Sequence, residues 1–360
     1  MIYDLRSVKD ADVKNKTVFL RADLDIPLKD FKVIDDTRLS AWFPTLEYLL
    51  SQEAKVIIAG HLGRPEGKDD KLSLKPVAEW ASKRFKIYDP PAIASKALRA
   101  GLRFKNFGGF EGWEISENIA LLENLRFYKE EEENDKEFSK NLAGLAEIYV
   151  NDAFASSHRV HASIVGVTKY LPSFAGLRLE KEIGQLSKIL NDPKRPLVVI
   201  IGGAKIETKL PLVEKMHHFA DYVLVGGEIA ENDKLLLRVQ HEKITGRKSS
   251  LLIADLTENE KDITVKSAEN FLQIAQNCQT IVWNGPMGLI EDEKYQNGTN
   301  ILAEGLAETS CYKVVGGGDT LGFLKKKNLF DKFSFASIGG GAMLEFLAGV
   351  KLPGLEALRK

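Results

Sequence analysis

The stretch Tyr312-Lys-Val-Val-Gly-Gly-Gly-Asp-Thr-Leu-Gly-Phe-Leu-Lys325 is the part of the sequence from which the fold is best argued. Its two valines are typical of a short buried strand, three glycines end that strand, and the leucine spacing beyond them predicts a helix. Glycines lack Cβ atoms, so backbone N–H groups can approach a ligand, and the helix adds the positive end of its dipole. This favours a phosphate, with Asp319 placed to hold Mg²⁺ against it. The stretch alone fits equally well an ordinary tight turn with Asp319 as an N-cap residue.

Length and composition set the frame for the rest of the chain. A chain of 360 residues exceeds what one hydrophobic core usually serves, so two domains are expected. The content of 44% hydrophobic and 28% charged residues is that of a globular protein. The net charge of −1 provides no general attraction for nucleic acid, so any cationic site must be local. Cys278 and Cys311 are too few for a disulfide framework or a cysteine-based zinc site.

Targeting and membrane segments are not expected. Residues 1–16 carry charges throughout and lack the apolar region of a signal peptide. No apolar run approaches the length needed to cross a membrane. We therefore expect a cytoplasmic protein with neither a membrane nor a nucleic-acid partner.

Apolar runs of strand length alternate with longer segments of helical period. Strands are predicted at Thr17–Ala22, Lys55–Gly60, Ile119–Glu123, Glu147–Asn151, Leu197–Gly202, Tyr222–Gly227, Leu251–Asp255, Thr280–Asn284, Lys313–Gly316 and Phe335–Gly339. Helices are predicted at Leu39–Leu50, Leu74–Arg84, Lys136–Leu145, Leu177–Leu190, Thr208–Phe219, Lys266–Ala275 and Thr299–Glu308. Apolar strands that alternate with helices predict an α/β fold with parallel sheets covered on both faces. The acidic run Lys129–Glu133 is expected to be the solvated start of a helix.

Prolines around one predicted helix suggest where two lobes join. Pro172 precedes this helix, of about residues 177–191, and the segment Asn191–Pro196 follows it. We expect an N-terminal lobe of residues 1–175 and a C-terminal lobe that begins at residue 176.

Charged side chains follow four predicted strands of the first half. They are Arg21, Asp23 and Asp25; His61 and Arg64; Arg126; and Asp152, His158, Arg159 and His161. Ligands of open α/β sheets bind outside the carboxyl ends of the strands. Each cation alone is more simply a surface residue or part of an ion pair. Together they favour a small substrate with phosphate and carboxylate groups, which guanidinium groups bind through two hydrogen bonds.

Glycines follow the predicted strands of the second half. They are Gly202 and Gly203; Gly226 and Gly227; Gly285 and Gly288; Gly316, Gly317 and Gly318; and Gly339, Gly340 and Gly341. Close backbone approach, with Lys205 and Lys209 nearby, suits a nucleotide polyphosphate. Neither GxxxxGK[ST] nor GxGxxG occurs, so P-loop and dinucleotide-binding sites lose support. A lobe for a small anion and a lobe for a nucleotide predict phosphoryl transfer.

Ten motifs in order resemble the phosphoglycerate kinase family along almost the whole chain. They are Arg21–Pro27, Asp35–Leu39, Gly60–Pro65, Leu122–Glu130, Tyr149–Ser163, Gly202–Lys209, Val282–Gly288, Val315–Thr320, Ser337–Glu345 and Leu352–Leu358. The resemblance implies two Rossmann-like lobes joined by a hinge helix, with Leu352–Leu358 returning to the N-terminal lobe. The N-terminal lobe would then be residues 1–175 with the tail 346–360, and the C-terminal lobe residues 176–345. It implies phosphoryl transfer from 1,3-bisphosphoglycerate to Mg-ADP, giving 3-phosphoglycerate and ATP. A monomer that closes around its substrates, with Mg²⁺ as the cofactor, is expected.

The resemblance also assigns site residues. Those for 3-phosphoglycerate are Arg21, Asp23, Asp25, Arg38, His61, Arg64, Arg126 and Arg159. Those for the nucleotide are Gly203, Lys205, Lys209, Gly227, Asn284, Pro286, Glu291, Gly316, Gly317, Gly318, Asp319 and Thr320, with Asp319 as the Mg²⁺ ligand. The catalytic set is Arg38, Lys209, Gly318 and Gly341. In it, Arg38 stabilises the phosphoryl group in flight, and Lys209 lies closest to that group on the nucleotide side.

Three residues and one segment depart from the family pattern. Asp25 replaces the usual Asn, which places a carboxylate beside an anionic substrate unless Arg21 or Arg38 neutralises it or it is protonated. Ile338 replaces a usual Thr, and Glu228 replaces a third glycine. The segment from Glu231 to about Ser250 is shorter than expected, which concerns nucleotide affinity and base preference.

Two further hypotheses follow from these departures. One is a catalytically impaired homologue that acts as a binding protein, although Arg38, Lys205, Lys209 and Asp319 are all retained. The other is a kinase of another small acyl phosphate, with Asp25 carrying the change of specificity.

Overall fold

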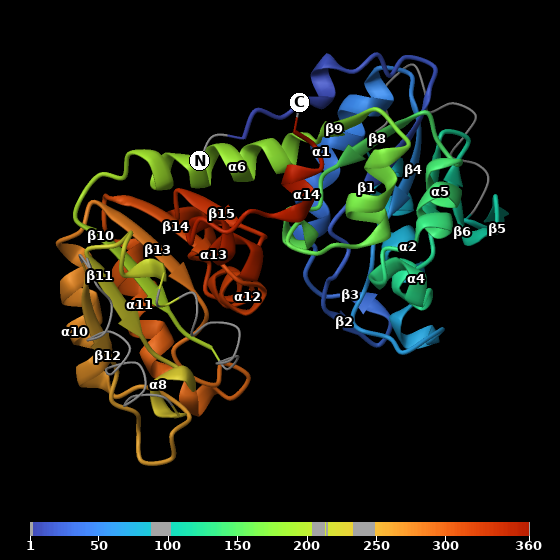
Figure 1. The fold of residues 1–360 in the computed structure, drawn as a ribbon. Helices are drawn as coiled ribbons and strands as arrows, with labels where there is room; N and C mark the ends of the chain where they lie inside the picture. The colour runs from blue at the N-terminus through green and yellow to red at the C-terminus, as the bar shows by residue number, and fades with distance from the viewer. Residues whose placement is uncertain (1–2, 88–101, 204–212, 214, 233–248, 360) are drawn as a thin grey trace. The chain divides into compact units, whose positions relative to one another are not determined.

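The computed structural model describes residues 3–87, 102–203, 213, 215–232 and 249–359. Its contacts divide the chain into two compact units. The N-terminal unit is Ile2–Ile183 with Lys351–Lys360, and the C-terminal unit is Gly184–Val350. Each unit contains its own sheet and hydrophobic core (Figure 1). The helix α6, Leu177–Asn191, begins in the N-terminal unit and ends in the C-terminal unit.

The sheet of the N-terminal unit has a doubly wound parallel part. Its strand order is β5 (Arg103–Phe107), β6 (Phe110–Ser116), β7 (Ile119–Leu122), β4 (Lys55–Ala59), β1 (Thr17–Arg21), β8 (Ile148–Asn151) and β9 (Ser173–Ala175). The strands from β7 to β9 are parallel, and their order reverses between β1 and β8. A separate short hairpin pairs β2 (Leu28–Lys29) with β3 (Lys32–Val33).

One edge of this sheet differs from the prediction. The strands β5, β6 and β7 pair antiparallel, whereas the sequence analysis expects parallel sheets. The turn Gly108–Gly109 joins β5 to β6, with both glycines at positive φ. Most of β5 is exposed, and charged or polar residues interrupt its two phenylalanines, so it lacks the apolar run that reveals a buried parallel strand.

The sheet of the C-terminal unit is parallel throughout. Its strand order is β12 (Ser250–Ile253), β11 (Tyr222–Val225), β10 (Leu197–Ile201), β13 (Thr280–Asn284), β14 (Tyr312–Gly316) and β15 (Phe335–Ser337). The order reverses between β10 and β13. All ten strands predicted from the sequence are confirmed, with ends that differ by no more than about two residues, the usual uncertainty of boundaries.

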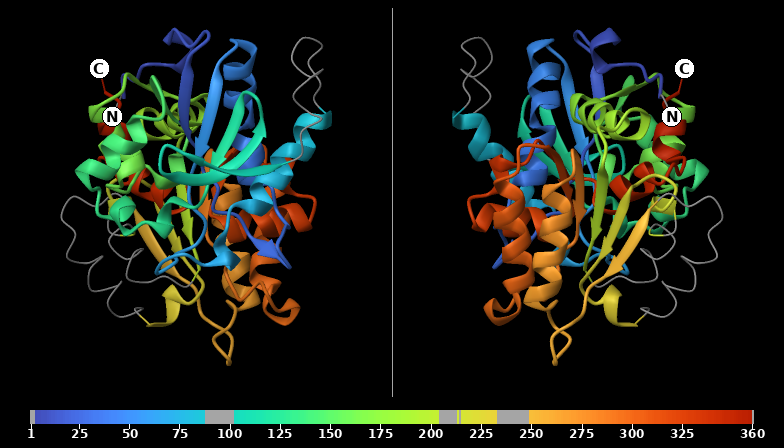
Figure 2. Two further views of the ribbon diagram at one scale, coloured as in Figure 1. Left: turned by 90° about the vertical axis from the view of Figure 1, so that its right-hand side faces the viewer. Right: turned by 90° about the vertical axis from the view of Figure 1, so that its left-hand side faces the viewer.

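Helices lie between the strands in both units. In the N-terminal unit they are α1 (Thr37–Ser51), α2 (Lys75–Ile87), α4 (Lys129–Glu132), α5 (Lys136–Ala143) and α14 (Pro353–Glu356). In the C-terminal unit they are α8 (Ile229–Asn232), α10 (Val265–Gln276), α11 (Asn297–Ala307), α12 (Gly318–Lys326) and α13 (Gly341–Leu347). The helices α10 and α11 lie side by side (Figure 2). Six of the twelve residues of the predicted helix Thr208–Phe219 lie outside the described residues.

The C-terminal segment packs on the N-terminal unit. The backbone N–H of Gly354 donates to the carbonyl of Ser157 at 2.8 Å, and Leu5 bridges to Arg359. A Cβ at position 354 would lie 3.0 Å from the Cα of Ser157, so a glycine permits this approach.

Asp152 connects the end of β8 to the start of α6. One carboxyl oxygen accepts from the backbone N–H of Leu179 at 2.9 Å, and the other accepts from the Thr45 hydroxyl at 2.5 Å. Thr45 in turn accepts from the backbone N–H of Leu177 at 3.0 Å. The side chains of Asp152 and Thr45 thus satisfy the first N–H groups of the helix that runs through both units. Burial raises the pKa of Asp152 to about 7.

We predict that Asp152→Asn changes the pH dependence of stability. In the native state the carboxyl group stays protonated up to about pH 7, whereas in the unfolded state it ionises near the ordinary aspartate pKa of 3.8. The unfolded state therefore binds fewer protons between these values, and the wild type loses stability as the pH rises. From pH 5 to pH 7.5 its free energy of unfolding should fall by about 2 kcal/mol relative to Asp152→Asn.

Guanidinium denaturation at the two pH values measures this difference. The matched control is Asp192→Asn, which changes an exposed carboxylate at the other end of α6 and should follow the wild type. If Asp152→Asn and the wild type show parallel pH dependence, Asp152 is already ionised in the native protein at pH 5.

Candidate functional site

Several of the expected site residues that the structure describes lie at the carboxyl edges of the two sheets. Arg21 is the last residue of β1, Asn284 the last of β13, and Gly316 the last of β14. The strand order reverses beside β1 in one sheet and beside β13 in the other. At such a reversal the connections leave toward opposite faces, so loops and side chains line the strand ends.

Arg21 is a fully buried cation beside His61. Its Nε donates to the Ser163 hydroxyl at 2.8 Å, and Nη1 donates to the carbonyl of Ala22 at 2.5 Å. Its Nη2 lies 3.1 Å from Nδ1 of His61. Because guanidinium only donates, Nδ1 of His61 must accept, and the ring proton is on Nε2.

Two histidines of this unit, His61 and His161, have lowered pKa values because they are buried beside arginine side chains. Burial, followed by the charges of Arg21 and Arg126, places the pKa of His61 well below its ordinary value. The same causes lower the pKa of His161 to about 3. Both rings are therefore neutral near pH 7, because the neighbouring guanidinium groups already supply the positive charge.

Asp23 is held away from solvent by the turn after β8. It accepts from the backbone N–H of Ala155 at 2.8 Å and from the Ser156 hydroxyl at 3.1 Å. Burial raises the pKa of Asp23, and the charges of Arg38 and Arg21 oppose that rise. Its position indicates that it shapes the site through this turn.

The unusual Asp25 is neutralised by Arg38. Nη1 of Arg38 lies 3.5 Å from Oδ2 of Asp25 and also donates to its backbone carbonyl. Oδ1 of Asp25 accepts from the backbone N–H of Gly63 at 3.0 Å, and Arg126 donates to the carbonyl of Gly63 at 2.7 Å. Arg38, Asp25, Gly63 and Arg126 thus form one hydrogen-bonded group, which meets the electrostatic condition that the sequence analysis attached to Asp25.

The remaining two arginines of the predicted set are more accessible. Arg64 is exposed, on the loop that follows β4. Arg159 is half-buried, and its charge contributes to the lowered pKa of Arg126, for which burial is the main cause. Arg159 therefore lies close to Arg126.

The sequence analysis was wrong about one residue of the acidic run after β7. Glu132 and Glu133 are exposed, as expected of a solvated helix, but Glu131 is fully buried. Its oxygens accept from the hydroxyl and the backbone N–H of Ser163. No sequence signal separated Glu131 from its neighbours, because four residues of α4 are too few to show which face is buried.

In the C-terminal unit, a glycine turn joins β14 to α12. Gly317 has φ 96°, a conformation that favours glycine, and no side chain caps the first turn of α12. Gly318 and Asp319 are exposed in that turn. The first N–H groups of α12 and the exposed Asp319 thus lie in the same turn.

Asn284 and Thr320 hold this turn to its neighbours. The Asn284 amide donates to the carbonyl of Gly340 at 3.3 Å, so it links the turn after β13 to the turn before α13. The fully buried Thr320 accepts from the backbone N–H of Gly285 at 3.1 Å. Its hydroxyl oxygen therefore has a structural partner, and its proton is what remains for a ligand.

Two more glycines meet where β10 and β11 end. Gly203 and Gly227 both have positive φ, and a Cβ on Gly227 would lie 2.7 Å from the backbone nitrogen of Gly203. The N–H of Gly203 donates to the carbonyl of Pro286 at 2.8 Å. Glu291 is exposed. The predicted Lys205 and Lys209 lie outside the described residues.

Metal binding would rest on one carboxylate. Among the residues that the structure describes, no group of three or more His, Cys, Asp or Glu side chains could hold a metal ion. Mg²⁺ is commonly bound by one or two carboxylates together with substrate phosphates. Asp319, exposed beside an uncapped helix N-terminus, suits that arrangement.

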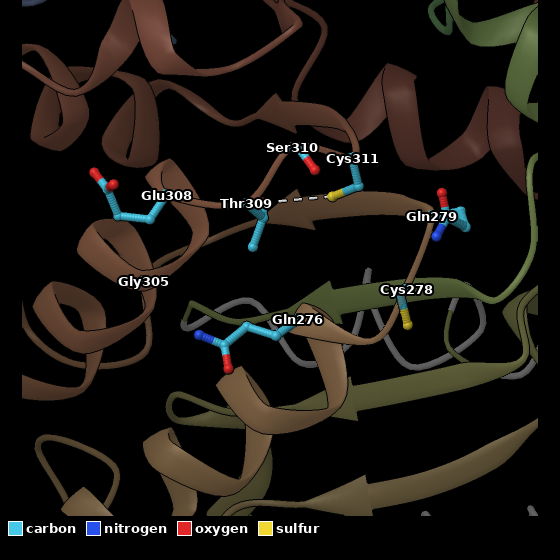
Figure 3. A pocket seen from close by; sticks show the side chains of 8 residues that line it. All are labelled: Gln276, Cys278, Gln279, Gly305, Glu308, Thr309, Ser310 and Cys311. Carbon is cyan, nitrogen blue, oxygen red and sulfur yellow. Dashed lines mark hydrogen bonds between the residues drawn. The ribbon is translucent and has the colours of Figure 1, made fainter.

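A cavity of about 300 Å³ lies away from these groups (Figure 3). Its lining residues all precede β13 or β14 and include Cys278 and Cys311. It therefore lies at the amino ends of these strands. The sulfur atoms of the two cysteines do not point toward each other.

Comparison with known proteins gives one family. A family model described as phosphoglycerate kinase matches residues 8–248 and 236–350. Relatives with that name from Dictyoglomus turgidum and Coprothermobacter proteolyticus are 39% and 38% identical, over 99% and 98% of this chain and 98% of each relative. A Triticum aestivum relative, named phosphoglycerate kinase, cytosolic, is 38% identical over 97% of this chain and 96% of its own.

Solved structures of the same name are also similar. Phosphoglycerate kinase from Coxiella burnetii matches with a TM-score of 0.77 and 34% identity, and that from Pyrococcus horikoshii with 0.80 and 30%. Each match covers 98% of both chains. The Coprothermobacter alignment extends over 400 residues, more than this chain contains, so that relative has residues with no counterpart here. The two family matches overlap at 236–248, within the segment that the sequence analysis found shortened.

We predict that Thr320→Val destabilises the C-terminal unit and that Thr320→Ser does not. Valine has nearly the same shape but leaves the buried N–H of Gly285 without its acceptor. Such a loss costs about 1–3 kcal/mol, whereas serine keeps the oxygen. Guanidinium denaturation of the ligand-free proteins measures the difference. Equal stability of the valine and serine variants would contradict a structural role for this hydrogen bond.

Proposed function

Because the chain belongs to the phosphoglycerate kinase family, we propose that the cations of its N-terminal unit bind 3-phosphoglycerate and that the glycine turns of its C-terminal unit bind the nucleotide. Membership of this family establishes the reaction. The protein is a phosphotransferase of glycolysis that transfers a phosphoryl group reversibly from 1,3-bisphosphoglycerate to ADP, giving 3-phosphoglycerate and ATP.

The positive group in the N-terminal unit is the observation that carries the substrate site. Arg21 and Arg126 are buried, and their charges help to hold two histidines neutral. An anion in the same place would be favoured by the charges that disfavour histidine protonation. We assign the site to Arg21, Asp23, Asp25, Arg38, His61, Arg64, Arg126 and Arg159.

We propose that Arg38 stabilises the phosphoryl group during its transfer. It is half-buried and is held by Asp25, which fixes its direction and leaves other guanidinium N–H groups for a ligand. Charge spreads over the phosphoryl oxygens in the transition state, and a prealigned guanidinium stabilises that charge. The acyl phosphate provides its own leaving group, so the mechanism needs no strong general base.

On the nucleotide side, we propose that α12 supplies backbone donors to the phosphates. Gly316, Gly317 and Gly318 leave space for the approach, and the N-terminus of α12 has no side-chain cap. Lys205 and Lys209 would add charge. Asn284 and Thr320 would position the turn, and Gly203, Gly227, Pro286, Glu291 and Gly341 complete the proposed set.

We assign Mg²⁺ to Asp319, since the exposed carboxylate beside the α12 N-terminus is a suitable hard ligand. When bound, Mg²⁺ neutralises charge on the nucleotide phosphates. Asp319 itself would orient the metal-nucleotide complex.

The setting of the enzyme is also proposed by analogy with its family. We propose a cytoplasmic monomer that uses ADP and ATP and has neither a nucleic-acid nor a membrane partner. Among the described residues, no helix is long and apolar enough to cross a membrane.

We predict that Arg38→Ala lowers kcat at least about 100-fold, because it removes charge stabilisation from the transition state. The test is a coupled assay of ATP-dependent phosphorylation of 3-phosphoglycerate. The matched control is Lys29→Ala, which removes an exposed cation from β2. An equal loss of kcat in the two variants would mean that Arg38 acts only through the overall positive charge and makes no specific contact with the phosphoryl group.

We predict that Asp25→Asn lowers KM for 3-phosphoglycerate about fivefold. Asparagine keeps an oxygen for the N–H of Gly63 but removes the negative charge beside Arg38 and the substrate. A half-exposed ion pair of this kind is worth about 1 kcal/mol, which corresponds to that factor. KM for ATP should not change. A higher KM for 3-phosphoglycerate would show that Arg38 needs Asp25 more than the substrate needs relief from its charge.

We predict that Asp319→Asn raises the Mg²⁺ concentration at half-maximal activity by about tenfold, because it weakens a charged metal ligand. Asp331→Asn changes an exposed carboxylate in the turn after α12 and serves as the control. An unchanged Mg²⁺ dependence in Asp319→Asn would remove the metal assignment.

A further inference from the structure

The buried charge of Arg21 has no direct counter-ion. Its guanidinium is fully buried, and in the part of the chain that the structure describes it forms no ion pair with a carboxylate. Its hydrogen bonds go to a hydroxyl, a carbonyl and an imidazole nitrogen. Burying a charge without compensation is costly, so another group must supply negative charge nearby.

Ser163 leads from Arg21 to a carboxylate. Its hydroxyl oxygen accepts from Nε of Arg21 at 2.8 Å, since a guanidinium only donates. The single hydroxyl proton is then free to donate to Oε1 of Glu131, at 2.5 Å. The backbone N–H of Ser163 donates to the other oxygen, Oε2, at 2.9 Å. Both oxygens of Glu131 therefore act as acceptors, a pattern that suits the ionised carboxylate.

The surroundings of Arg21, Ser163 and Glu131 are buried and closely packed. Glu131 is fully buried, and the carbonyl of Ser163 accepts from the Tyr149 hydroxyl at 2.7 Å. A Cβ on Gly166, in the same turn, would lie 2.0 Å from the Ser139 hydroxyl oxygen, so this turn packs closely on α5. Burial raises the pKa of Glu131, and the charge of Arg21 and the bonds from Ser163 oppose that rise. The carboxylate and the guanidinium thus stabilise each other across the serine.

We propose that Glu131 is a positioning residue for the substrate, which fixes and compensates the Arg21 guanidinium through the Ser163 hydroxyl. The consequence extends to His61, because Nη2 of Arg21 holds Nδ1 as an acceptor and keeps the ring proton on Nε2. The inference rests on the proposed role of Arg21 in binding 3-phosphoglycerate. Glu132 does not share this role, because it is exposed and its carboxylate pairs with Arg126 at 3.1 Å.

Ser163→Ala and Glu131→Gln test the proposal in the full-length enzyme. We expect each to raise KM for 3-phosphoglycerate about tenfold, the usual effect of losing a hydrogen bond to a charged group. KM for ATP should change by less than about twofold. The double variant should be no worse than the more impaired single variant, because both changes break the same chain. The matched control is Glu133→Gln, which changes an exposed glutamate directly after α4 and should behave like the wild type.

The KM values distinguish a failure of the Glu131 proposal from a failure of the proposed role of Arg21. Equal increases in both KM values, or additive effects in the double variant, would indicate general loss of structure and overturn the proposal. Unchanged KM values in Ser163→Ala and Glu131→Gln, with a raised KM for 3-phosphoglycerate in Arg21→Ala, would also overturn it. An unchanged KM in Arg21→Ala would instead overturn the proposed role of Arg21. Far-UV circular dichroism and thermal unfolding identify any variant that fails to fold, and Ser163→Ala, the smaller change, then decides.

Discussion

Reversal of strand order is the constraint on which the functional groups of both units depend. Next to β1, and again between β10 and β13, neighbouring parallel strands lead their connections to opposite faces of the sheet. The carboxyl ends of these strands are therefore finished by turns and side chains. Arg21 and the Asp152 turn occupy that place in one sheet, and Asn284 and the glycine turns occupy it in the other. The two units apply one backbone geometry to two different chemical tasks.

In the N-terminal unit, the partners of the arginine side chains stabilise positive charge that is buried or half-buried. Two of the cations are held by a carboxylate and a backbone carbonyl: Arg38 by Asp25, and Arg126 by Glu132 and the carbonyl of Gly63. Arg21 is held instead by a hydroxyl that donates to Glu131. These partners compensate the charge without removing all donors from the site. Asp25, which stands where the family usually has Asn, fits this scheme as the partner of Arg38. Burial, together with the same concentration of charge, lowers the pKa of His61 and keeps its ring neutral.

In the C-terminal unit the task is to bring backbone donors close to a ligand. The residues that matter are therefore mainly those without side chains, and the side chains of Asn284 and Thr320 tie the turns together. Ile338, where the family usually has Thr, is buried, so its side chain contributes to packing before the glycine turn. Glu228 is exposed, which makes its substitution for glycine structurally tolerable.

The sequence by itself determined ten strands, the described helices other than the shortest ones, the glycine turn before α12 and the family, because these depend on apolar period, on glycine and on contiguous motifs. It did not reveal β5, which is mostly exposed and has no apolar run, or the burial of Glu131 among three other glutamates. It also missed Ser163 as a partner of Arg21 and Asp152 as the cap of α6. Those contacts join residues far apart in the chain, such as Arg21 and Ser163. Only tertiary structure brings such groups within hydrogen-bond distance, and so only it could decide which charges are compensated and how.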